Sequence, residues 1–111
     1  MVVLVTGGTR GIGKACVRAF CERGEKVRFF YRSADRETVE ALERETGAVG
    51  MRVDVSDRAA VREGIDRIIG EEGRLDVLVN NAGMAQIGLF TDLTEEDYVA
   101  LRGTNLDGAV F

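Results

Sequence analysis

The sequence predicts an α/β fold in which a parallel sheet is covered by helices on both faces. Short apolar runs alternate along the chain with longer segments of helical periodicity, which is typical of βαβ units. The first apolar run, from Val2 to Thr6, leads directly into a glycine-rich turn that opens a helical pattern. Right-handed crossovers then place the strands in the order 3-2-1-4. We therefore expect an incomplete Rossmann-type doubly wound sheet.

The expected strands are short apolar segments bounded by polar or glycine-containing turns. They are Val2 to Thr6, Lys26 to Tyr31, Val49 to Val53 and Leu75 to Asn80. The last of them is apolar through Val79 except for Asp76, as expected for a central strand covered on both faces.

The first two expected helices each end at a glycine, the residue that most readily adopts the left-handed conformation of a helix C-cap. One runs from Ile12 to Arg23 before Gly24, and the other runs from Ala34 to Thr46 before Gly47. The second helix is expected to point Val39 and Leu42 inward. The first helix is expected to bury one apolar stripe, consisting of Ile12, Ala15, Cys16, Ala19 and Phe20.

The third expected helix begins after Ser56 or Asp57, either of which can cap it, and ends before Gly73. Its expected apolar face consists of Val61, Ile65, Ile68 and Ile69. Thr94 can cap a last helix that is still running at Phe111, so the fold is expected to stop in mid-helix. The inward stripe of that helix consists of Tyr98, Leu101, Asn105 and Ala109, with Tyr98 expected in the core.

Composition and charge narrow the classes of function that the chain could have. The 111 residues suit one domain, and 15 basic against 19 acidic residues give a net charge of -4 without a basic block, so nucleic acid is not an expected partner. No apolar run has the length of a membrane span, and the first strand begins at Val2, so we expect a cytoplasmic protein. Histidine is absent, and Cys16 and Cys21 are expected to be free thiols, so no metal site is expected.

The turn after the first strand has the glycine spacing G-x-x-x-G-x-G. Gly7 is expected to take the positive φ of a tight turn, Gly11 to leave room for a pyrophosphate, and Gly13 to let the helix lie close to the sheet. The first N–H groups of the helix then form an anion site. We therefore expect a phosphate-bearing cofactor, contacted at this turn by Gly7, Thr9, Arg10, Gly11, Ile12 and Gly13.

A second motif, Asn80-Asn81-Ala82-Gly83, follows the fourth expected strand. Together with the glycine turn it resembles the classical short-chain dehydrogenase/reductase family, and is most similar to its 3-oxoacyl-acyl-carrier-protein reductase branch. The resemblance runs from Val2 to Phe111 and implies that the whole chain is the N-terminal, dinucleotide-binding part of a single Rossmann domain. It implies an oxidoreductase that reduces a ketone or 3-oxoacyl group or oxidises the alcohol, with hydride exchanged with a nicotinamide.

The resemblance also assigns roles beyond the glycine turn. The residues that it implies contact the cofactor there are Asp54, Val55, Asn81, Ala82 and Gly83. It implies that Asn105 distorts its helix, so that the backbone carbonyl holds a water of a proton relay. From the residues alone, the alternative for Asp54 is a turn residue before Ser56, and the alternative for Asn105 is an amide satisfied in the core.

The end of the second expected strand indicates which nicotinamide cofactor is preferred. An acid there would accept hydrogen bonds from the ribose hydroxyls of NAD and repel a 2′-phosphate. This chain has Tyr31 followed by Arg32, and Arg10 lies in the glycine turn. We therefore expect NADP(H) to be preferred, with NAD(H) as the weaker cofactor, although Asp35 just beyond could reduce the difference.

The catalytic serine and Tyr-x-x-x-Lys that the family uses are not found. Tyr31 lies at a strand, and Tyr98 is followed four residues later by Arg102. We therefore expect the 111-residue chain alone to lack dehydrogenase activity. The alternative is a non-catalytic NADP(H)-binding or sensing module. For a complete family member, the resemblance implies a homo-oligomer, tetramer or dimer, with a small-molecule or acyl-carrier-bound ketone or alcohol as substrate.

Overall fold

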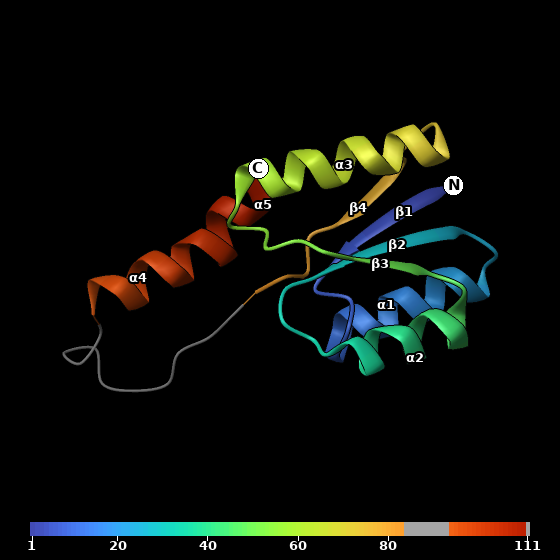
Figure 1. Ribbon diagram of the computed structural model, residues 1–111, viewed down its shortest axis with the longest axis horizontal. Helices are drawn as coiled ribbons and strands as arrows, with labels where there is room; N and C mark the ends of the chain where they lie inside the picture. Colours follow the sequence, from blue (N-terminus) through green and yellow to red (C-terminus); the bar gives the residue numbers. More distant parts are fainter. Residues whose placement is uncertain (84–93, 111) are drawn as a thin grey trace.

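The protein folds around one parallel sheet, seen in a computed structural model that describes residues 1–83 and 94–110. The strands are β1 (Val2–Thr6), β2 (Lys26–Tyr31), β3 (Val49–Arg52) and β4 (Val77–Val79). They are arranged in the order β3-β2-β1-β4, which confirms the predicted topology (Figure 1). The helices are α1 (Gly11–Glu22), α2 (Arg36–Thr46), α3 (Arg58–Glu72), α4 (Glu95–Arg102), a π-helical turn labelled η2 (Gly103–Asp107), and α5 (Gly108–Val110).

Helices cover both faces of the sheet, with α1 and α2 on one side and α3 on the other (Figure 1). Phe29 and Phe30 are adjacent in β2, so their side chains point to opposite faces, and both are fully buried. Phe29 belongs to a cluster with Val17 of α1 and Leu42 of α2, whereas Phe30 belongs to a cluster with Ile68 of α3. The core therefore consists of two apolar layers separated by the sheet.

The predicted helix ends are confirmed. Gly24, Gly47 and Gly73 follow α1, α2 and α3 in the left-handed conformation, with φ of +83°, +82° and +81°. Asp57 caps α3, since its side chain accepts a hydrogen bond from the amide of Ala60. Helix α2 begins two residues later than predicted because Asp35 serves as its N-cap.

The predicted face of α1 is partly wrong. Ile12 is 75% exposed, and Ala15 and Ala19 are also exposed, whereas Gly13 and Val17 are buried. The close approach of Gly13 to the preceding turn rotates the helix so that the face through Gly13 and Val17 meets the sheet. The half-buried residues that extend this face are Cys16, Phe20 and Cys21.

Two other burial predictions are wrong. Ile69 of α3 is 45% exposed, because the buried face of that helix runs through Val61, Gly64 and Ile68. Strand β4 is shorter than predicted, and its Leu78 is 48% exposed rather than covered. Among the described strands, β4 lies at the edge of the sheet beside β1, so it lacks the neighbours of a central strand.

The last helical region begins as predicted, but the side chains that it buries differ from those predicted. Thr94 caps α4 in a capping box, in which Thr94 and Asp97 each accept a hydrogen bond from the other's amide. Tyr98 is 53% exposed, so its assignment to the core is wrong for the described residues. Within residues 1–83 and 94–110, none of the helices combines the length and apolarity that crossing a bilayer demands.

Candidate nucleotide-binding site

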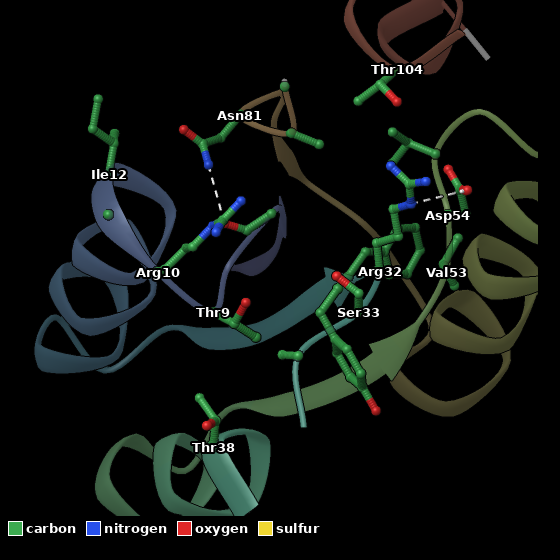
Figure 2. A pocket seen from close by; sticks show the side chains of 18 of the residues that line it. Thr9, Arg10, Ile12, Arg32, Ser33, Thr38, Val53, Asp54, Asn81 and Thr104 are labelled. Carbon is green, nitrogen blue, oxygen red and sulfur yellow. Dashed lines mark hydrogen bonds and ion pairs between the residues drawn. The ribbon is translucent and has the colours of Figure 1, made fainter. Parts of the chain in front are cut away.

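The strands of the sheet end at a cavity of about 720 Å³, a volume typical of small-molecule sites. It lies at the carboxyl ends of β1 and β4, where the strand order reverses, the position at which doubly wound sheets bind ligands. Figure 2 shows side chains from separate segments of the chain directed toward it. The sequence-predicted cofactor residues that line it are Gly7, Thr9, Arg10, Gly11, Ile12, Arg32, Asp54, Val55, Asn81, Ala82 and Gly83.

The glycine turn is shaped by backbone contacts that exclude side chains. Gly7 has a φ of +67° and Gly11 a φ of +56°, both in the left-handed region that favours glycine. A Cβ on Gly13 would lie 2.0 Å from the Gly7 carbonyl oxygen and 2.5 Å from Nδ2 of Asn81. Gly13 does not line the cavity; it allows α1 to pack against the turn and Asn81.

The N-terminal end of α1 meets the cavity without a side-chain cap. Its N-cap, Arg10, is extended and makes no capping hydrogen bond, and the first turn of α1 carries no acidic residue. The first amides of a helix have no intrahelical acceptor, and the helix dipole makes this end positive. Gly11 and Ile12, the first residues of α1, both line the cavity, so an anion there would meet these amides.

The end of β4 is tied to β1 and to the glycine turn. The buried hydroxyl of Thr6 accepts hydrogen bonds from the amides of Asn81 and Ala82, both at 3.0 Å, and donates to the carbonyl of Val79. Nδ2 of Asn81 donates to the carbonyl of Gly7 at 3.2 Å (Figure 2). The sequence analysis did not select Thr6 for this role. The available signal for this role was a threonine at the end of the first strand, beside the strand that ends in the Asn-Asn pair.

Arg32 and Asp54, which follow the neighbouring strands β2 and β3, form an ion pair at the cavity wall. Nε of Arg32 lies 3.6 Å from Oδ2 of Asp54 (Figure 2). Oδ1 of Asp54 accepts hydrogen bonds from the amide and hydroxyl of Ser56, at 3.0 and 2.7 Å. Partial burial opposes ionisation of Asp54, but the Ser56 hydrogen bonds and the Arg32 charge outweigh it and hold its pKa below the usual range. Asp54 is therefore both a turn residue and a cavity residue.

The cavity wall also contains two polar residues that the sequence analysis did not select. Ser33 and Thr38 line the cavity together with Asp35. The carboxylate of Asp35 accepts a hydrogen bond from the amide of Thr38 at 2.7 Å, which lowers the pKa of Asp35. Asp35 is therefore negatively charged at neutral pH. This wall thus combines guanidinium, hydroxyl and carboxylate groups.

The predicted catalytic Asn105 lies beside the cavity rather than in its wall. Asn105 is exposed, so its predicted place on an inward stripe is wrong, whereas its neighbour Thr104 is 8% exposed and lines the cavity. Both residues lie in the π-helical turn η2, where Thr104, three residues after the half-buried Leu101, takes the inward position. A Cβ on Gly83 would lie 3.3 Å from Oδ1 of Asn105, so the amide adjoins the Asn81–Gly83 segment.

Known proteins are similar to this chain in both sequence and fold. The family model described as short chain dehydrogenase matches residues 1–111. Acetoacetyl-CoA reductase of Rhizobium meliloti is 42% identical over 96% of this chain and 44% of its own length. The 3-oxoacyl-[acyl-carrier-protein] reductase FabG of Thermotoga maritima is 35% identical over 96% of this chain and 45% of its own.

A solved short chain dehydrogenase of Burkholderia cenocepacia, in complex with NADP, has a TM-score of 0.92 and 34% identity. The match covers 97% of this chain and 46% of that one. The chain thus spans less than half the length of each of these three relatives.

Proposed function

The chain belongs to the short chain dehydrogenase family of oxidoreductases, and from that membership we propose that its cavity binds NADP(H) in preference to NAD(H). We propose further that the chain is the N-terminal, dinucleotide-binding part of one Rossmann domain. In the complete protein, this part serves the reduction of a ketone or 3-oxoacyl group, or the oxidation of the corresponding alcohol. The substrate is a small molecule or an acyl-carrier-bound group.

The geometry of the turn fits a dinucleotide. A Cβ on Gly11 would point into open space beside the uncapped end of α1, so glycine keeps that space free for a diphosphate. Asp54 and Val55 line the same cavity as the turn and are the proposed neighbours of the adenine. When bound, the nicotinamide accepts or supplies the hydride. The residues of this chain bind and orient it, and Asn105, in the distorted turn η2, is the proposed member of the proton relay.

The observation that carries the NADP(H) preference is the presence of two arginines, Arg10 and Arg32, among the residues that line the cavity. Strand β2 ends at Tyr31, with no carboxylate at the position where one would bind the ribose hydroxyls of NAD(H). A guanidinium hydrogen bond to a phosphate contributes about 1.5 to 3 kcal/mol, which corresponds to a preference of about tenfold or more.

Fluorescence titration of the purified chain with NADPH and NADH tests the preference. We expect NADPH to bind about tenfold more tightly or better, and Arg32→Ala to weaken NADPH binding by about tenfold while changing NADH binding by less than about twofold. Arg36→Ala is a matched control, because Arg36 is an exposed arginine of α2 outside the cavity wall. Equal affinities of the wild-type chain for the two nucleotides would contradict the proposal.

A second candidate is a non-catalytic NADP(H)-binding or sensing module. The catalytic serine and Tyr-x-x-x-Lys of the family are not found in residues 1–111, and a positioned proton donor typically contributes about 10²- to 10⁴-fold to the rate. We therefore expect this chain to bind NADPH without oxidising it when a 3-oxoacyl thioester is added. NADPH oxidation by the complete protein would favour the enzyme over the sensor, and binding without turnover would favour the sensor.

The complete protein is proposed to be a cytoplasmic homo-oligomer, a dimer or tetramer. Size-exclusion chromatography with light scattering would measure its mass in solution. A monomer would contradict this part of the proposal.

A further inference from the structure

Asp35 places a negative charge in the wall proposed to receive the 2′-phosphate of the cofactor. It lines the same cavity as Arg10, Arg32 and Ser33, and it is the N-cap of α2. A carboxylate at this position repels a phosphate, because like charges in one partly desolvated cavity interact unfavourably over several ångströms. The guanidinium groups of Arg10 and Arg32 act in the opposite direction.

We propose that Asp35 is a specificity-determining residue that weakens the binding of the 2′-phosphorylated cofactor and so limits its preference over NAD(H). This inference rests on the proposed function, because it supposes that the cavity binds nicotinamide nucleotides. It assigns the carboxylate an effect on one cofactor rather than on both. Only NADP(H) carries the additional anionic group.

The structural role of Asp35 can be separated from its charge. Its Oδ1 accepts the hydrogen bond from the amide of Thr38 at 2.7 Å, and this bond needs an oxygen acceptor but not a negative charge. Asparagine and serine are comparably good N-caps. Asp35→Asn therefore keeps the cap of α2 and removes the charge, and Asp35→Ser provides a second, smaller neutral cap.

Asp57 offers a matched control within the same chain. It caps α3 in the same way, with Oδ1 accepting from the amide of Ala60 at 3.2 Å, but it does not line the cavity. Asp35→Asn and Asp57→Asn change the net charge equally and replace the same kind of cap. A difference between their effects on nucleotide affinity therefore reports the position of the charge.

The experiment measures dissociation constants of NADPH and NADH for the wild type, Asp35→Asn, Asp35→Ser and Asp57→Asn at low and high salt. We expect both Asp35 variants to bind NADPH about three- to tenfold more tightly and NADH within about twofold of the wild type. Asp57→Asn should leave both constants within about twofold. The gain in NADPH affinity should shrink at high salt, because mobile ions screen the repulsion.

Three outcomes would overturn the inference. Unchanged NADPH affinity in both folded Asp35 variants would show that the charge has no effect. An equal gain in Asp57→Asn would show that net charge alone acts. A loss of NADH affinity with unchanged NADPH affinity would identify Asp35 as a ribose ligand. Failure of the proposed function is distinguishable from these, because then the wild-type chain would bind neither nucleotide or would bind both with equal affinity.

Discussion

The first two helices both begin at the wall of the same cavity, but their N-terminal ends differ. Helix α1 begins behind Arg10, which makes no capping hydrogen bond, and its first turn has no acidic residue. Helix α2 begins behind Asp35, whose carboxylate accepts from Thr38, and its first turn contains Glu37. The two helices have the same dipole, so the dipole alone does not make a binding site. In α2 the amide of Thr38 is satisfied by the Asp35 side chain, whereas no side chain caps α1, so its first amides remain available to a ligand.

The largest expected effect comes from placing a side chain where α1 packs closely against the glycine turn. In Gly13→Ala the new Cβ would lie 2.0 Å from the Gly7 carbonyl oxygen, so the backbone of the turn must move. We expect a loss of about 3 kcal/mol in the free energy of unfolding, measured by urea denaturation, and loss of detectable NADPH binding.

Gly70→Ala is the control for that variant. Gly70 lies inside α3, and a Cβ there would meet nothing within 4 Å. Alanine should therefore stabilise the chain by about 0.5 to 1 kcal/mol through helix propensity. If Gly13→Ala behaved like Gly70→Ala, the close packing of α1 against the turn would not be needed for either folding or binding.

A smaller effect is expected where β4 is held beside the open end of α1. Thr6→Val removes the hydroxyl that accepts from the amides of Asn81 and Ala82, and leaves two partly buried donors without that acceptor. We expect a loss of about 2 kcal/mol in thermal or urea unfolding, with weaker NADPH binding because Asn81 contacts the glycine turn. Thr6→Ser retains the hydroxyl and should recover most of both losses, whereas equal effects of Val and Ser would contradict the hydrogen-bonding role.

The smallest effect is a pH dependence confined to α2. The hydrogen bond from Thr38 lowers the pKa of Asp35, so its contribution to stability is fully present above its unfolded pKa of about 3.9. That contribution is lost as the pH falls through the lower, folded pKa. NMR titration should show the chemical shift of the Thr38 amide changing in this acidic range. The amide of Ile12 in α1 has no capping carboxylate, so its chemical shift should not show this transition. The same midpoint at both amides would contradict the contrast between the two helix ends.

Much of the site could be predicted because its residues lie at the ends of strands and helices, where residue type and local conformation are closely linked. The conformations of Gly7, Gly47 and Gly73 follow from the positions of glycine after a strand or a helix. The convergence of Arg32 and Asp54 on one cavity follows from parallel strands that end at the same edge. The residues that were missed, Thr6 and Thr104, have ordinary local patterns and gain their positions only through packing.

The sequence alone determined the order of the strands, the ends of the first three helices and the segments that surround the cavity. These properties depend on local chemistry, namely apolar periodicity, the conformational freedom of glycine and the capping ability of short polar side chains. Tertiary structure decided which face of α1 is buried, that Thr104 rather than Asn105 lines the cavity, and that Arg32 pairs with Asp54. These outcomes depend on contacts between segments far apart in the chain, which local periodicity does not describe.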